Sequence, residues 1–141
     1  MAHALKNYQG DCANIHGHSY ELDVTVIGLI APNDGGGMVT DFKKLKSIVQ
    51  EYIIDVFDHS LVMNAEMDAQ QKQALGSLTG KVHFMPFNPT SENMLTEFVS
   101  RLEPQFRQDI SLHHLKLRET ANCFAEWYAG DNADSVVSRK S

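Results

Sequence analysis

An alternating segment, from His18 to Ile27, constrains the fold more than any other part of this 141-residue chain. One face carries the apolar side chains and the other face the polar ones: Tyr20, Leu22, Val24 and Val26 against Glu21, Asp23 and Thr25. Alternation with a period of two is typical of a β-strand with one buried and one solvated face. The segment therefore predicts a half-buried strand whose apolar face needs a covering layer.

Two amphipathic helices can provide that layer. Thr40 or Asp41 caps a first helix that ends near Phe57, and Thr90 or Ser91 caps a second one. Further elements are expected as strands over 81–87 and 111–120, a short helix or loop over 65–78, and a loop over 31–37. The amphipathic alternation favours an antiparallel sheet with helices on one face, which is an α+β fold.

Chain length and net charge limit the number of domains and the kinds of binding partner that are expected. Residues 1–130 are expected to form a single domain, followed by a polar tail over 131–141. The formal net charge is -6 and lysines cluster only over 43–46, so nucleic-acid binding is not expected. No apolar run approaches the ~20 residues needed to cross a bilayer, and the N-terminus lacks a signal-peptide pattern. A cytoplasmic protein without a membrane partner is expected.

The segment HGH is a candidate metal site at the start of the alternating strand. His16 and His18 project to the same side of an extended chain, about 7 Å apart at the backbone. A catalytic zinc site needs a third protein ligand. His3 is the nearest candidate, and the alternatives are His83, His113 and His114. Otherwise HGH is a turn with solvated histidines.

Six short motifs follow one another along the chain: AHAL, C-x3-HGHSY, MVTDF, DHSLVMN, NPTSEN and RET. Together they resemble the 6-pyruvoyl- and 6-carboxy-tetrahydropterin synthase family, and the C-x3-H spacing is similar to its bacterial carboxy branch. The resemblance implies the tunnelling fold, in which two helices pack on one face of a four-stranded antiparallel sheet. It also implies a homo-oligomeric ring, a hexamer made of two trimers.

The resemblance implies a role for each matching residue. The implied zinc ligands are His3, His16 and His18. The implied catalytic residues are Cys12 as the thiol and the pair Asp58 and His59 as acid and base. The implied substrate-binding residues are Glu119 as the pterin anchor, with Thr90, Ser91 and Glu92. The family normally has a full strand before AHxL, whereas two residues precede His3 here, so we expect His3 to be the least firmly held ligand.

The implied activity is that of a zinc-dependent lyase, 6-carboxy-5,6,7,8-tetrahydropterin synthase, in queuosine biosynthesis. Its substrate is 7,8-dihydroneopterin triphosphate, and its products are 6-carboxy-tetrahydropterin, acetaldehyde and triphosphate. Two alternatives stay open. The first is a 6-pyruvoyl-tetrahydropterin synthase, which eliminates triphosphate and keeps the side chain, and the second is a non-catalytic zinc- or pterin-binding homologue.

Each candidate residue also has an ordinary structural explanation. Cys12 is otherwise a small buried residue or a fourth zinc ligand, which would close the metal site. His59 is otherwise a histidine placed favourably at a helix C-terminus, beside Asp58. Glu119 otherwise forms a salt bridge with an arginine. The residues of the NPTSEN segment are otherwise a helix start, and Cys123 is expected to be structural.

Overall fold

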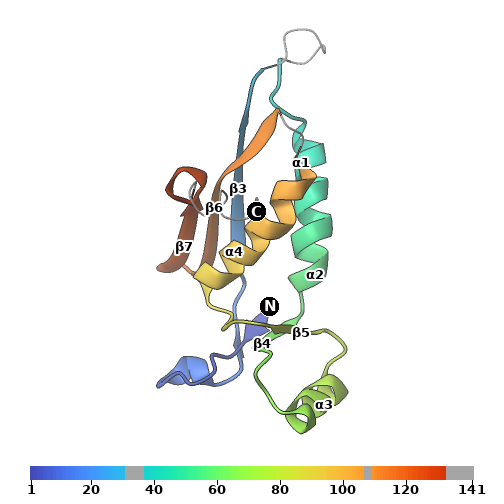
Figure 1. Cartoon of the computed structure of the whole chain (residues 1–141), viewed down its shortest axis with the longest axis vertical. Coiled ribbons are helices and arrows are strands. Elements are labelled where there is room, and N and C mark those ends of the chain that lie inside the picture. The colour runs from blue at the N-terminus through green and yellow to red at the C-terminus, as the bar shows by residue number, and fades with distance from the viewer. Residues whose placement is uncertain (31–36, 107–108, 133–141) are drawn as a thin grey trace, which may run out of the picture.

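The chain folds into an α+β architecture in which two helical segments cover one face of an antiparallel sheet (Figure 1). The computed structural model describes residues 1–30, 37–106 and 109–132. The loop predicted over 31–37 and the tail predicted over 131–141 therefore lie mostly outside the described residues. Within them, no helix is both long and apolar enough to cross a membrane.

The antiparallel sheet is built on the alternating segment. Its strands are β3 (Glu21–Gly28), β6 (Ile110–Thr120) and β7 (Cys123–Tyr128), in the order β3-β6-β7. Exposed and half-buried residues alternate along the whole of β3, as predicted. Strand β7 was not predicted, because a two-residue turn over 121–122, without the glycine that usually marks a hairpin, joins it to β6.

The two predicted helices are confirmed, and their caps are those that the sequence indicated. The first consists of α1 (Phe42–Val49), a π-helical turn (Gln50–Ile54) and α2 (Asp55–Phe57) in succession. The carboxylate of Asp41 accepts a hydrogen bond from the backbone N–H of Lys43 at 2.7 Å. The second helix is α4 (Ser91–Leu102), capped by Thr90.

A second, smaller sheet lies at one end of the molecule (Figure 1). Its order is β2-β1-β4-β5, with β1 (Ala2–His3), β2 (His16–Gly17), β4 (Leu61–Asn64) and β5 (Val82–Met85). Strand β1 pairs antiparallel with β2 and parallel with β4, and β4 pairs parallel with β5. Helix α3 (Ala69–Leu78) connects β4 to β5. Short 3-10 turns complete the elements: η1 (Asp11–Ala13), η3 (Glu103–Gln105) and η4 (Ala129–Asn132).

The strands are thus arranged in two sheets, whereas a single four-stranded antiparallel sheet was expected. Among the described residues, the antiparallel sheet has three strands, because β1 pairs with β2 and β4 rather than with β3. The α3 crossover makes β4 and β5 parallel, which alternation in the long strands could not indicate.

One hydrophobic core lies between the helices and the antiparallel sheet. Its fully buried members come from the π-helical turn, β4, α4 and β6: Ile53, Val62, Met94, Leu95, Leu102, Leu115 and Leu117. The apolar face predicted for β3 packs against this cluster. This packing fixes the ends of β3, β6 and α4 relative to each other, and those ends carry the site.

Candidate metal centre

Three histidines from the smaller sheet and the segment after it form a compact cluster. Pairing of β1 with β2 places His3 directly opposite His16, and His18 follows two residues later. One ligand nitrogen from each ring lies within 4.8 Å of the other two. The two histidines of HGH therefore do converge, and His3 is the candidate that joins them. Such a cluster could hold a metal ion.

His3 is the most firmly fixed of the three, contrary to expectation. Its side chain is buried, and its Nδ1 lies 2.7 Å from the carbonyl oxygen of Pro89. Burial lowers the pKa of His3, although the bond to the Pro89 carbonyl opposes this effect. The short strand β1, held between β2 and β4, gives His3 the support that a longer first strand was expected to provide.

The hydrogen bonds around these rings suit a cation. Nδ1 of His3 faces the Pro89 carbonyl, and Nδ1 of His16 lies 2.8 Å from the carbonyl oxygen of Asn14. In the neutral rings both Nδ1 atoms then carry the proton, and both Nε2 atoms present lone pairs. These Nε2 atoms are 3.2 Å apart. Two nitrogens bound to tetrahedral zinc at about 2.0–2.1 Å are separated by about 3.3 Å, so the residues fit zinc.

A cavity of about 250 Å³ opens beside the histidine cluster. It brings together six of the residues singled out from the sequence: His3, Cys12, Thr90, Ser91, Glu92 and Glu119. Cys12 is half-buried there. Cys123, expected to be structural, is exposed and lines the same cavity. Residues more than a hundred positions apart thus share one cavity, because the start of β3 pairs with the end of β6.

Glu119 is held by a tyrosine rather than by an arginine. The hydroxyl of Tyr20 donates to Oε1 of Glu119 at 3.0 Å, and Arg118 instead lies 3.5 Å from a carboxylate oxygen of Glu21. Burial and, second, the negative charge of Glu119 raise the pKa of Tyr20. Sequence reasoning placed Tyr20 only on the apolar face of its strand. The sequence signal for this contact was a polar hydroxyl on an otherwise apolar face, two residues after His18.

The polar side chains at the start of α4 serve either to cap the helix or to line the cavity. Thr90 accepts a hydrogen bond from the backbone N–H of Asn93 at 3.4 Å, which is the ordinary role of a cap. The hydroxyl of Ser91 is buried and has no hydrogen-bond partner among the described residues. A buried hydroxyl left in this way costs about 1–3 kcal/mol. Ser91 therefore has a hydroxyl whose hydrogen-bonding capacity is unused, and it lines the cavity together with the exposed Glu92.

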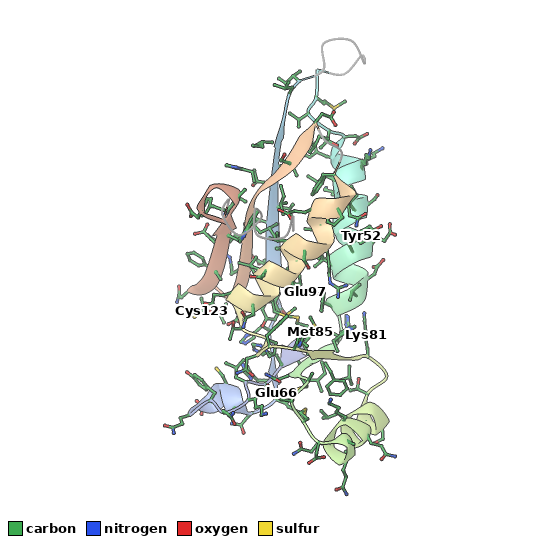
Figure 2. The ribbon with its side chains drawn as sticks, in the orientation of Figure 1. Tyr52, Glu66, Lys81, Met85, Glu97 and Cys123 are labelled. Carbon is green, nitrogen blue, oxygen red and sulfur yellow. The ribbon has the colours of Figure 1, made fainter. Side chains whose placement is uncertain are left out.

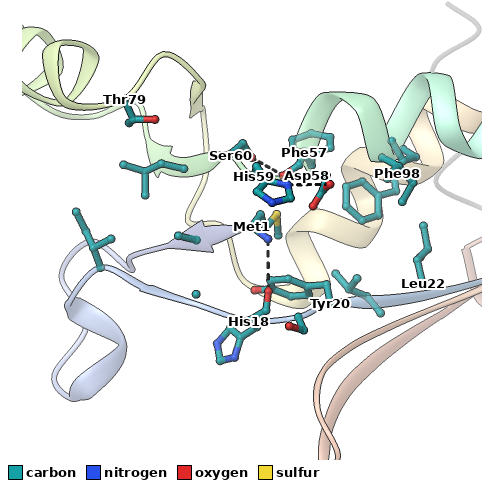
Figure 3. A pocket seen from close by; sticks show the side chains of 18 residues that line it. Met1, His18, Tyr20, Leu22, Phe57, Asp58, His59, Ser60, Thr79 and Phe98 are labelled. Carbon is teal, nitrogen blue, oxygen red and sulfur yellow. Dashed lines mark hydrogen bonds and ion pairs between the residues drawn. The ribbon is translucent and has the colours of Figure 1, made fainter.

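Asp58 and His59 line a different and larger cavity, of about 920 Å³ (Figure 3). Nδ1 of His59 lies 2.9 Å from Oδ2 of Asp58. Adjacent side chains can meet in this way because His59 has a φ of 55°, so the pair sits in a turn. The hydrogen bond from His59 is the main cause of a lowered pKa of Asp58. Within one chain, these two residues do not share the cavity of Cys12 and Glu119.

The histidine cluster and Tyr20 stand between the two cavities. His18 and Tyr20 line the larger cavity, opposite Asp58 and His59 (Figure 3). His3 and Glu119, which both lie within hydrogen-bonding distance of the Tyr20 hydroxyl, line the smaller one. The predicted acid–base pair and the predicted thiol therefore approach the cluster from different cavities.

Comparison with known proteins assigns the chain to a family. Residues 1–130 match the model of the family described as 6-pyruvoyl tetrahydropterin synthase. A 6-carboxy-5,6,7,8-tetrahydropterin synthase of Rickettsia felis is 35% identical over 127 residues, covering 88% of this chain and 90% of the relative. The enzyme of the same name from Haemophilus influenzae is 35% identical over 130 residues, covering 90% and 91%.

A solved structure shows the same fold. The 6-pyruvoyl tetrahydropterin synthase of Caenorhabditis elegans superposes with a TM-score of 0.66 at 24% identity, over 90% of this chain and 86% of that one. The tunnelling fold expected from the sequence is thereby confirmed, although the strands are shared out between two sheets. On the family match and the identity to its curated relatives, this chain belongs to the 6-pyruvoyl tetrahydropterin synthase family.

Proposed function

We propose that this protein is a zinc-dependent 6-carboxy-5,6,7,8-tetrahydropterin synthase. With water, it converts 7,8-dihydroneopterin triphosphate to 6-carboxy-tetrahydropterin, acetaldehyde and triphosphate. The observation that carries the proposal is the cavity in which Cys12 and Glu119 meet beside the three-histidine cluster. The bacterial relatives at 35% identity bear the name of this enzyme.

Glu119 binds the pterin ring in this proposal. The amino group and the neighbouring ring N–H of a pterin lie side by side, and a carboxylate can accept from both. The Tyr20 hydroxyl occupies one acceptor position of Oε1 and leaves the others available. Because Tyr20 is itself held in the core face of the sheet, it fixes the orientation of the carboxylate. The buried hydroxyl of Ser91 supplies a further polar contact to the ring.

The proposed metal ligands are His3, His16 and His18, each of which offers a ring nitrogen within 4.8 Å of the other two. A zinc ion bound there would lower the pKa of the hydroxyl groups on the substrate side chain. The positive charge would also suit a triphosphate substrate, which a chain with a formal net charge of -6 does not otherwise attract.

Proton transfer is assigned to two groups on different sides of the cluster. Cys12 lines the cavity of the pterin anchor and moves a proton at the substrate side chain. His59, oriented by Asp58, is the second acid and base. This pair acts either from the larger cavity of the same chain or on the site of a neighbouring subunit.

The remaining parts of the proposal are a homohexamer, made of two trimers, and a cytoplasmic role in queuosine biosynthesis. An edge strand supports association, because β7 ends the antiparallel sheet and carries the exposed side chains of Phe124 and Tyr128. Sedimentation velocity of the purified protein tests the assembly, and a monomer at micromolar concentration contradicts it.

The decisive assay is incubation of the zinc-loaded protein with 7,8-dihydroneopterin triphosphate. We expect acetaldehyde and triphosphate in equal amounts. Triphosphate without acetaldehyde would instead identify the pyruvoyl reaction, whose name a Dictyostelium discoideum relative at 29% identity carries. If neither product is released, the protein is instead a non-catalytic zinc- or pterin-binding homologue. The variant Cys12→Ala is the matched control for turnover by a contaminating enzyme.

A further inference from the structure

The C-terminal end of the first helical segment is held by side chains from the distant strand β5 and from Lys81, the residue before it. Nζ of Lys81 donates to the carbonyl oxygens of Asp55 and Asp58, both at 2.7 Å. Nε2 of His83 lies 2.8 Å from the carbonyl oxygen of Val56. The last carbonyls of a helix have no partner within the helix. The β5 segment thus supplies partners for this end and adds a positive charge where the helix dipole favours one.

Lys81 also holds the chain on the far side of the same turn. Its backbone carbonyl accepts a hydrogen bond from the N–H of Leu61 at 3.0 Å. One residue therefore contacts the helix end at Asp55, the turn itself at Asp58 and the first residue of β4 at Leu61. Figure 2 shows Lys81 beside the lower end of α2, where this turn begins.

Inside the turn, the hydroxyl of Ser60 donates to the carbonyl oxygen of Phe57 at 2.7 Å. Asp58 and His59 themselves are held less firmly. The side chain of His59 is 90% exposed and that of Asp58 is 57% exposed, so packing does not fix either of them. His59 also has a φ of 55°, a left-handed conformation that a residue with a side chain adopts only when the surroundings impose it. The position of the imidazole is consequently set by the backbone of the turn.

We propose that Lys81 is a positioning residue for the Asp58–His59 pair. This inference rests on the proposed function, in which His59 moves a proton. Lys81 does not line either of the two cavities, so it is not proposed to contact the substrate or the metal. It holds the carbonyl of Asp58 and the helix end, and thereby keeps the imidazole and the carboxylate directed into the larger cavity that His18 also lines.

The test compares Lys81→Met, which keeps the length of the stem and removes the donors, with Lys81→Arg, which keeps donors and charge. Lys43→Met is the control, because Lys43 is exposed in the first turn of α1. For Lys81→Met we expect kcat to fall about tenfold with KM and zinc content unchanged. Lys81→Arg should restore most of kcat, and Lys43→Met should match the parent.

A second readout needs no turnover. The ¹³Cε1–¹Hε1 signal of His59, followed in a pH titration without substrate, should shift in Lys81→Met and return toward the parent position in Lys81→Arg. Two results would overturn the proposal: a kcat and a His59 signal in Lys81→Met that equal those of the parent, or a loss of kcat that Arg does not restore and that follows a matching loss of stability. If the parent itself shows no turnover, the proposed function fails, and the His59 signal still decides whether Lys81 positions the pair.

Discussion

The hydroxyl of Tyr20 lies between Glu119 and His3, donating to Oε1 of the carboxylate at 3.0 Å and standing 3.4 Å from Nε2 of the imidazole. A single side chain, on the residue before β3, therefore contacts both the proposed pterin anchor and a proposed metal ligand. Because Tyr20 directly precedes β3 and Glu119 lies in the neighbouring strand β6, the register of β3 against β6 sets this contact. The proposed metal centre and the proposed pterin-binding site therefore share one contacting side chain.

Removal of that hydroxyl should weaken substrate binding more than catalysis. In Tyr20→Phe the carboxylate of Glu119 loses the bond that orients it, so we expect KM for 7,8-dihydroneopterin triphosphate to rise about three- to tenfold, which corresponds to roughly 0.7–1.4 kcal/mol. Steady-state kinetics measure this. Tyr8→Phe, at an exposed position, is the control. An unchanged KM would show that Glu119 needs no orientation by Tyr20.

Loss of one clustered histidine should abolish tight zinc binding. We expect the purified protein to carry about one zinc per chain, and His16→Ala to lower zinc affinity by more than the 10–100-fold that loss of an outer hydrogen bond costs. Zinc content by mass spectrometry and competition with a chelator measure the effect. His113→Ala, at an exposed position of β6, should retain the metal. Zinc retention by His16→Ala would contradict the proposed ligand set.

The thiol of Cys12 should be needed for turnover but not for metal binding. Proton transfer by a positioned group contributes about 10²–10⁴-fold to a rate, and we expect Cys12→Ala to lose activity in that range with its zinc in place. Cys123→Ala, in the same cavity but exposed, is the comparison and should remain active. If Cys12→Ala instead loses zinc, the thiol is a fourth ligand and the site is structural.

Titration of Asp58 should report its bond to His59. The pKa of Asp58 lies below the ordinary value of 3.8 because the His59 side chain donates to it. A carboxyl whose pKa is lower in the folded than in the unfolded chain adds stability above about pH 3.8, and that stability is lost as the pH falls through the folded pKa. In His59→Ala the midpoint, followed by ¹³C NMR of the carboxyl carbon, should rise toward 3.8. His113→Ala should leave it in place.

The core between α4 and β6 should dominate stability. Leu115 is fully buried, and its truncation in Leu115→Ala should lower the free energy of unfolding by about 2–5 kcal/mol. Denaturant unfolding of the zinc-loaded protein measures the loss. Leu78→Ala, at a side chain that is 81% exposed, should change stability by less than about 0.5 kcal/mol. Equal effects of the two substitutions would show that this layer is not the core.

The long elements could be predicted from the sequence because local signals determine them. The alternation of β3, the carboxylate cap at Asp41 and the helix start at Thr90 each act within a few residues. The segment predicted as a strand over 81–87 contains β5, whereas β4, β7 and the mixed pairing of the smaller sheet were missed, because a short strand is stabilised by its neighbours rather than by its own pattern.

The sequence by itself determined which side chains are available to the site: the HGH pair, a thiol four residues before it, and a carboxylate on the apolar face of the last predicted strand. Only the tertiary structure decided which of them meet. It buried His3 against Pro89, joined Tyr20 to Glu119, and placed Asp58 and His59 in a separate cavity. Local patterns act over one or two turns of chain, whereas these contacts depend on strand register and on packing between residues up to 99 positions apart.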